Sequence, residues 1–382
     1  MSLIALMGLV VLVAACTSDV AEPAGGTETE SVDEQRTQTT PLYLIGYVAP
    51  YEEVLGAMSR SGFSYPGYEP PTKYMQIEAY FTKDGGSSPE QRTIRHSSTS
   101  DKWFYTPPDE IPGANYQVYG YMPHDIGEVT ITPNSTYAEG VTMNFTKMNI
   151  VTAQDLCVMV GAKHATAYDN VTGDYTFGDG NPKPGDFDCK MTSGENASNY
   201  IFLFFDHIYA SISFRFRVHE DYAKVRSIHL KKLQLTPYTD NTYTVPRYKE
   251  MTATIVLKKK TDGSSPIQSI ALTNDPTSGA ANQETFFEGD KELTPITWSE
   301  EMAYVPYTKS YYILRSTYDI YDKKGNLIRQ NQVAETKLNP FYIFNVTDME
   351  RGKKYVLKLT VAPTYLYQLS DQDLDNPTII IN

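Results

Sequence analysis

Residues 211–218 read Ser-Ile-Ser-Phe-Arg-Phe-Arg-Val, and this stretch decides the fold class. Its apolar side chains occupy every second position: Ile212, Phe214, Phe216 and Val218. The positions between them are polar: Ser213, Arg215 and Arg217. Successive side chains of a β-strand point to opposite faces of the sheet, so this alternation predicts a half-buried antiparallel strand.

Similar segments extend along the chain in both directions. Strand-like runs lie at 73–80, 103–105, 116–123, 200–205, 225–235, 251–257, 311–321, 327–333, 354–361 and 378–381. Residues 322–326, Asp-Lys-Lys-Gly-Asn, join two of these runs and predict a β-hairpin. Short strands separated by Pro, Gly, Asn and Asp, without alternating helices, predict an all-β protein built of β-sandwiches.

Size and composition limit the architecture and the partners. Of the 382 residues, 30 are Tyr and 15 are Phe, and aromatic residues favour pleated sheets. Residues 41–382 exceed what one hydrophobic core usually holds. We therefore expect two domains, at 41–195 and 196–382. The net charge of −13 argues against nucleic acid and anionic membrane surfaces as partners.

Residues 1–16 have the pattern of a lipoprotein signal peptide. Apolar or small residues run without a break from Leu3 to Ala15, too short to span a bilayer but typical of a signal-peptide core. The run ends in Leu-Val-Ala-Ala-Cys, where small residues precede Cys16. We expect Cys16 to be acylated and the chain to be exported as an outer-membrane lipoprotein at the cell surface. The alternative is an N-terminal core helix with a buried thiol.

The segment after Cys16 predicts a tether followed by a first strand. Residues 17–40 contain few aliphatic side chains and therefore cannot bury enough apolar surface to fold. We expect them to form a flexible tether. Folded sequence begins near Pro41, and Leu-Tyr-Leu-Ile-Gly-Tyr-Val at 42–48 is the expected first strand.

The sequence contains no motif of a known catalytic type. It has no Gly-x-Ser-x-Gly, no His-Glu-x-x-His and no Walker-type phosphate loop, and its six histidines lack metal-ligand spacing. We expect no enzymatic activity and no cofactor. His207 follows the apolar run 200–205 and is either a ligand or acid–base group, or a core-edge histidine bonded to the backbone. The second interpretation is favoured.

We also expect no bound metal. The residues nearest to a calcium loop are Asp371, Asp373 and Asp375, since calcium takes carboxylate oxygens in flexible geometry. Asp residues also form ordinary turns, which is the favoured interpretation here.

The two remaining cysteines leave two alternatives open. In an oxidising compartment Cys157 and Cys189 either form a disulfide or remain two separate buried thiols. The sequence does not show whether their Cα atoms lie within bridging distance.

The aromatic side chains suggest an alternative function. Trp103, Trp298 and several tyrosines could form a flat platform on which sugar rings stack, as in a surface glycan-binding lipoprotein. The competing interpretation places these aromatic side chains in strand cores and cross-strand pairs.

Several segments together carry a family resemblance. They are Trp-Phe-Tyr at 103–105, Tyr-Gln-Val-Tyr-Gly-Tyr-Met-Pro at 116–123, Asp-Leu-Cys-Val-Met-Val-Gly-Ala at 155–162, Phe-Asp-His-Ile-Tyr-Ala-Ser-Ile-Ser-Phe at 205–214, and the C-terminal stretch 364–377. In this order, and behind a lipoprotein signal, they resemble the fimbrillin (Mfa-like) family of Bacteroides-type lipoprotein pilus and adhesion subunits.

The resemblance implies a fold, a role and partners. It implies two tandem transthyretin-like β-sandwich domains and a non-enzymatic structural or adhesion subunit of a surface pilus. The implied partners are other pilus subunits bound by strand exchange, the outer membrane through the lipid anchor, and a host or bacterial surface receptor.

The resemblance also implies candidate residues for assembly. In shaft subunits of the family, a protease cuts after an N-terminal arginine, and a strand of the next subunit fills the groove left by the first strand. Arg36 lies in the tether, whereas a cut after Arg60 would remove the strand that contains Leu42, Leu44 and Val48. In anchor subunits the lipid stays and no cleavage occurs. Residues 375–382 are either a donor strand or the last strand of their own domain.

Overall fold

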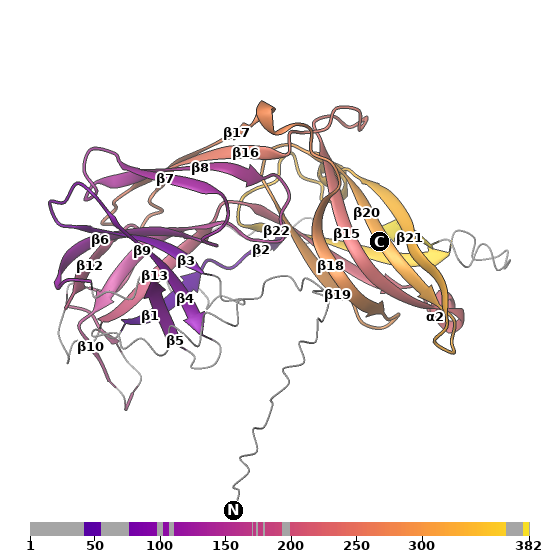
Figure 1. Ribbon diagram of the computed structural model, residues 1–382, viewed down its shortest axis with the longest axis horizontal. Helices are drawn as coiled ribbons and strands as arrows, with labels where there is room; N and C mark the ends of the chain where they lie inside the picture. Colours follow the sequence, from indigo (N-terminus) through magenta and orange to yellow (C-terminus); the bar gives the residue numbers. More distant parts are fainter. Residues whose placement is uncertain are drawn as a thin grey trace, which may run out of the picture. The chain divides into compact units, whose positions relative to one another are not determined.

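The computed structural model describes residues 42–54, 76–97, 102–106, 111–169, 171–172, 175–178, 180–192, 199–363 and 377–381. Within these ranges nearly all regular structure is β-strand, arranged in four large sheets and one small ribbon (Figure 1). The expected all-β class is therefore confirmed. No helix in the described part of the chain is both long and apolar enough to cross a membrane.

Sheet I is the largest sheet and has the strand order β1-β13-β9-β6-β3-β4-β5, with β12 also pairing β6. Its members are β1 (Leu42–Val48), β3 (Ile77–Lys83), β4 (Glu90–Ser97), β5 (Lys102–Thr106), β6 (Ala114–Met122), β9 (Cys157–Ala165), β12 (Asp188–Met191) and β13 (Asn199–His207).

Sheet II packs on one face of sheet I and forms the first sandwich. Its strands are β7 (Glu128–Pro133), β8 (Gly140–Asn149), β16 (Glu250–Lys258) and β17 (Ile267–Asn274). Apolar side chains from both sheets form one core, which includes Tyr121, Phe145, Phe204 and Ile255. The alternation of apolar positions on β16 and β8 supplies the sheet II half of this core.

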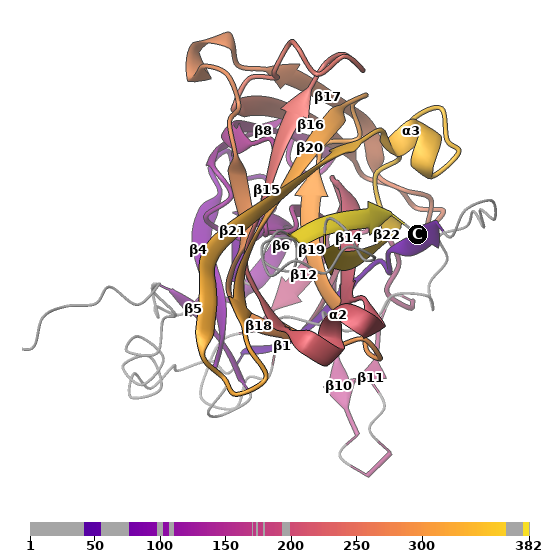
Figure 2. The ribbon, with the colours of Figure 1, turned by 90° about the vertical axis from the view of Figure 1, so that its right-hand side faces the viewer.

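Sheets III and IV form the second sandwich. Sheet III contains β2 (Glu52–Val54), β14 (Ala210–Val218), β19 (Ser299–Val305), β22 (Lys353–Pro363) and β23 (Pro377–Ile381). Sheet IV contains β15 (Ser227–Tyr238), β18 (Glu284–Leu293), β20 (Tyr311–Tyr321) and β21 (Leu327–Leu338), which lie side by side in Figures 1 and 2.

The stretch 211–218 lies at the centre of sheet III. Its four alternating apolar side chains all lie in the core between sheets III and IV, as predicted. Ser211 and Ser213 on the opposite face are buried as well, and Ser213 Oγ donates a hydrogen bond to Glu300 of the neighbouring β19. The first half of β14 is therefore covered on both faces.

The predicted hairpin at 322–326 is confirmed. The backbone amide of Asn326 donates to the Asp322 carboxylate at 2.8 Å, and Gly325 takes a positive φ of 85°. The expected strand at 225–235 is partly wrong, because α2 (Glu220–Val225) precedes β15. The His219 side chain caps this helix by accepting a hydrogen bond from the Asp221 amide.

The remaining elements are short. They are the ribbon β10 (Ala167–Tyr168) and β11 (Tyr175–Thr176), the 3₁₀ turn η1 (Pro276–Ser278) and the helix α3 (Pro340–Ile343). Figure 2 shows the β10–β11 ribbon projecting away from the large sheets. The predicted domain division at residue 195 remains a prediction. Strands from both sides of this position share sheet II, since β16 pairs with β8.

Candidate functional site

The first strand, β1, lies at the end of sheet I. Its residues pair in parallel with β13, from Leu42 opposite Asn199 to Val48 opposite Phe205, and the Ala49 amide donates to the Phe205 carbonyl at 3.0 Å. Its Cα trace also lies close to that of β5, the strand at the other end of the sheet. β1 therefore lies between β13 and β5, so that sheet I curves until its two end strands approach each other.

The face of sheet I that does not contact sheet II has an apolar core of its own. Ile201, Leu203 and Phe205 of β13 belong to this core, and Val48 of β1 packs against it. Because Phe202 and Phe204 face sheet II, β13 is buried on both faces. The β13 edge beside β1 is thus the edge of a strand whose side chains are apolar or aromatic from Tyr200 to Phe205.

The second N-terminal strand, β2, lies on β22 of sheet III. Glu52 pairs with Lys353 in parallel register, and the Glu52 amide donates to the Gly352 carbonyl at 3.1 Å. β14 occupies one side of β22, so β2 and the C-terminal strand β23 share the other side. Residues 42–54 therefore join both sandwiches, with β1 on the first and β2 on the second.

Ion pairs attach β2 to sheet III. Glu52 contacts Lys353, and Glu53 lies 3.1 Å from Lys354 and 3.2 Å from Arg215. Glu300 also pairs with Lys354 at 3.0 Å. Burial raises the pKa of Glu300, but hydrogen bonds from Ser213 and Lys354 outweigh that effect and lower it to about 2.

A buried polar cluster lies where the N-terminal segment passes from one sandwich to the other. His207 Nδ1 lies 2.7 Å from Asp155 Oδ2 and 3.3 Å from Cys157 Sγ, while His207 Nε2 donates to the Ala49 carbonyl at 2.5 Å. The Tyr51 hydroxyl donates to Asp155 Oδ1 at 2.8 Å, and its ring stacks on the imidazole at 3.7 Å. Asp155, Cys157 and His207 are all buried.

Arg351 extends this cluster towards sheet III. Its guanidinium donates to Asp206 Oδ2 at 2.8 Å and to the His207 carbonyl at 3.0 Å. Asp206 is buried, and its other oxygen, Oδ1, has no hydrogen-bond partner among the described residues. The salt bridge between Arg351 and Asp206 therefore links the end of β13 to the loop that precedes β22.

The cluster does not have the geometry of a catalytic triad. In a nucleophile–histidine–carboxylate triad, the two partners contact different ring nitrogens. Here Cys157 and Asp155 both face Nδ1. Burial, followed by the charge of Asp155, raises the pKa of Cys157 well above its usual range, so the thiol stays protonated.

His207 agrees with the favoured sequence interpretation of a core-edge histidine bonded to the backbone. Its contact with Asp155 was missed, because nothing in the local pattern indicates that residues near 155 and 207 meet. Burial lowers the pKa of His207, but the charge and hydrogen bond of Asp155 together with the charge of Asp206 outweigh that effect, so the pKa lies above its ordinary value.

The other predicted site residues divide into two groups. β1 contains Leu42, Leu44 and Val48 as expected. Outside the described residues lie Cys16, Arg36, Arg60, Asp371, Asp373 and Asp375. The two cysteine thiols, at Cys157 and Cys189, are buried and form no disulfide bond.

The glycan-platform alternative gains no support from Trp298. The Arg217 guanidinium lies 4.6 Å from the centre of its indole ring, so that ring face is already covered. The side chain of Trp103 is outside the described part of the structure.

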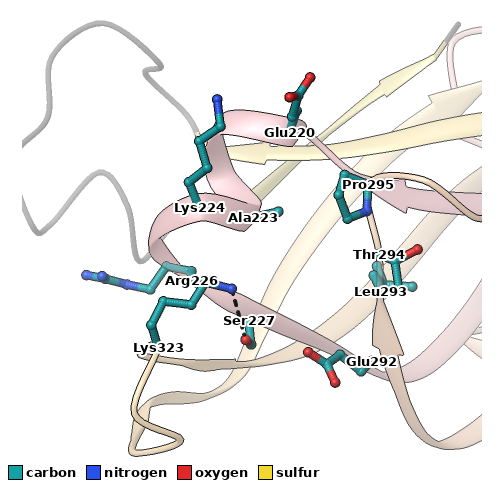
Figure 3. A pocket seen from close by; sticks show the side chains of 10 residues that line it. All are labelled: Glu220, Ala223, Lys224, Arg226, Ser227, Glu292, Leu293, Thr294, Pro295 and Lys323. Atoms are coloured by element: carbon teal, nitrogen blue, oxygen red, sulfur yellow. Dashed lines mark hydrogen bonds between the residues drawn. The ribbon is translucent and has the colours of Figure 1, made fainter.

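Two surface hollows in the described part of the structure are lined in part by charged side chains. One, of about 280 Å³, lies between α2 and the turn before β21 (Figure 3). Its cationic side chains, Lys224 and Arg226, point outward in different directions, and Lys323 donates to Ser227 at 3.3 Å. In the other, of about 600 Å³, Lys259 pairs with Asp188. Neither hollow has converging unpaired charges that would define a ligand.

No family model matches the chain, and no curated protein sequence matches it significantly. Similar solved structures include a "putative cell adhesion protein" from Bacteroides fragilis, at 10% identity and TM-score 0.38, covering 90% of this chain and 97% of that one. They also include a fimbrial protein from Bacteroides vulgatus, at 12% identity and TM-score 0.31, covering 90% and 98%.

A third is the fimbrial anchor protein Mfa2 from Porphyromonas gingivalis, at 10% identity and TM-score 0.28, covering 89% of this chain and 97% of that one. Fimbrial proteins are therefore among the solved structures to which this chain is similar.

Proposed function

We propose that this chain is an exported, non-enzymatic subunit of a surface pilus, assembled by removal of its N-terminal strands and their replacement by a strand of another subunit. The observation that carries the proposal is the position of β1. It is hydrogen-bonded to β13 at the end of sheet I, and it lies between that strand and β5.

The location of Arg60 supports a role for cleavage. Arg60 follows β1 and β2 in the sequence, whereas Arg36 precedes both strands. A cut after Arg60 would release the whole segment 42–54 together with the tether and Cys16. A cut after Arg36 would remove only the proposed lipid and part of the tether.

Loss of this segment would leave two edges without partners. The backbone groups of Asn199–Phe205 that face β1 and those of Lys353–Tyr355 that face β2 would lose their hydrogen bonds. Buried backbone groups without partners are costly, and an apolar strand edge readily pairs with another chain. An incoming strand would satisfy both needs, so removal of the segment favours polymerisation.

Lipidation at Cys16 fits this scheme as a holding step. While the N-terminal segment stays in place, the subunit is capped and attached to the outer membrane. Cleavage after Arg60 would free the subunit from the membrane and open it for assembly at the same time.

The experiment is digestion of the purified full chain with an arginine-specific protease, followed by N-terminal sequencing and negative-stain electron microscopy. We expect a new N-terminus at Ser61 and filaments. Arg60→Gln should abolish both, whereas the matched control Arg36→Gln should leave both unchanged. A synthetic peptide of residues 42–54 in excess should suppress filaments of the cleaved chain. A chain cleaved at Arg60 that stays monomeric would overturn the strand-exchange proposal.

A further inference from the structure

Three potential metal ligands meet at one buried point. Asp155 precedes β9, Cys157 begins it, and His207 ends β13 directly opposite Cys157. The Asp155 and Cys157 side chains both face His207 Nδ1. Among the described residues they form, with His207, a group whose ligand atoms all lie within 4.8 Å of one another.

The hydrogen bonds around the cluster determine which ring nitrogen of His207 presents a lone pair to Asp155 and Cys157. A carbonyl oxygen only accepts, so the contact with Ala49 requires the proton on His207 Nε2. Nδ1 then points towards Asp155 Oδ2 and Cys157 Sγ. A lone pair that faces a carboxylate oxygen at 2.7 Å requires a cation between them, either a proton or a metal ion.

The hydrogen bonds that His207 and Asp155 make to residues around the cluster are those expected of metal-binding side chains. A histidine that binds a metal usually donates its other ring N–H to a carbonyl or carboxylate, and a metal-binding carboxylate is itself hydrogen-bonded. Here the Ala49 carbonyl accepts a hydrogen bond from His207 Nε2, and the Tyr51 hydroxyl donates to Asp155 Oδ1. Asp155 Oδ2 therefore remains available to bind a metal ion.

We propose that Asp155, Cys157 and His207 bind a zinc ion. Zinc takes imidazole, thiolate and carboxylate ligands with bonds of roughly 2.0–2.3 Å, so tetrahedral donors lie roughly 3.3–3.6 Å apart. The Sγ–Nδ1 distance of 3.3 Å already matches, and the Nδ1–Oδ2 distance of 2.7 Å has to widen by about half an ångström.

The charge of the filled site suits its buried position. Zinc displaces the proton of the Cys157 thiol, which passes to solvent, and the imidazole binds in its neutral form. One carboxylate and one thiolate then neutralise the dication, so the buried centre carries no net charge. The proposed function is not needed for this inference, since all the contacts lie within the intact chain.

The test is metal loading during refolding. The full chain is unfolded in urea with a chelator and refolded with zinc or cobalt, and bound metal is counted by mass spectrometry. We expect about one ion per chain and a thiolate-to-cobalt charge-transfer band in the near ultraviolet. Zinc should also raise the melting temperature, because it binds the folded chain in preference to the unfolded one.

Variants assign the ligands. Cys157→Ser should remove the charge-transfer band, and the matched control Cys189→Ser should retain it. Tyr51→Phe keeps all three ligands and should weaken zinc affinity roughly 10- to 100-fold through the lost hydrogen bond to Asp155. Circular dichroism confirms that each variant folds. Refolded wild-type chain that retains no metal, or a cobalt band that persists in Cys157→Ser, would overturn the proposal.

Discussion

His207 Nδ1 and Asp155 Oδ2 lie 2.7 Å apart in the interior, and this contact joins the segment just before β9 to the end of β13. The two residues come from the segments 155–162 and 205–214, which carry much of the family resemblance. In the N-terminal segment, Tyr51 hydrogen-bonds to Asp155 and Ala49 hydrogen-bonds to His207. The pair therefore connects the proposed removable strands to the body of the protein.

Removing the Asp155 carboxylate should strongly destabilise the fold. Asp155→Ala leaves a buried imidazole without its charged partner, which costs about 3–5 kcal/mol for a buried pair. Urea unfolding in the presence of a chelator measures the change. The matched control is Asp221→Ala, which breaks the exposed pair with Lys224 and should reduce the free energy of unfolding far less. Equal losses in both variants would contradict the buried-pair interpretation.

Glu300 predicts a pH dependence of stability. Its pKa is lowered from 4.5 to about 2 in the folded chain, so its contribution is complete above pH 4.5 and is lost as the pH falls towards 2. Because the Glu300 side chain is 34% exposed and therefore partly screened by solvent, we expect the contribution to be about 1–2 kcal/mol. The difference in unfolding free energy between wild type and Glu300→Gln should shrink between pH 5 and pH 3. A constant difference would refute the assignment.

Val48→Asp should loosen β1 without unfolding the sandwiches. Val48 is half-buried against the core that contains Leu203 and Phe205, and a carboxylate there has no partner. Hydrogen exchange at the Ala49 amide, which bonds to the Phe205 carbonyl, should accelerate about tenfold or more. Pro50→Ala, at an exposed position, is the control. An unchanged exchange rate at the Ala49 amide in Val48→Asp would show that Val48 does not hold β1 in place.

The ion pair between Glu52 and Lys353 should contribute to the docking of β2. Lys353→Glu places two acidic side chains opposite each other and should cost about 1–2 kcal/mol, because the lysine side chain is only 12% exposed. The exchange variant Glu52→Lys/Lys353→Glu should recover more than half of that loss. Stability is measured by urea unfolding as a double-mutant cycle. An exchange variant no more stable than Lys353→Glu would exclude direct pairing.

Local sequence patterns predicted much of the sheet structure. The strands around 116–123, 251–257, 311–321 and 354–361 are present, because aromatic and alternating apolar residues report directly on burial in a sheet. Strands with exposed faces, such as β7 and β17, were missed. Their side chains are mostly accessible and so show little apolar alternation. Helix α2 was also missed, since a six-residue helix presents too short a pattern.

The candidate site was predicted only in part. Leu42–Val48 could be identified as a strand from its own residues, and His207 could be placed at the edge of a core. The role of β2 could not be inferred, because Glu52–Val54 is three residues long and its acidic side chains resemble an ordinary solvated loop. The position of β2 depends on its pairing with Lys353 and Lys354, which lie almost at the other end of the chain.

The sequence by itself determined the all-β class, the alternating strand 211–218 and the hairpin at 322–326, because side-chain periodicity and turn chemistry act between near neighbours. Only the tertiary structure decided that β1 lies on β13, that β2 and β23 share one side of β22, and that Asp155, Cys157 and His207 meet. These relationships depend on the register between strands distant in sequence, and that register is set by packing of the whole core.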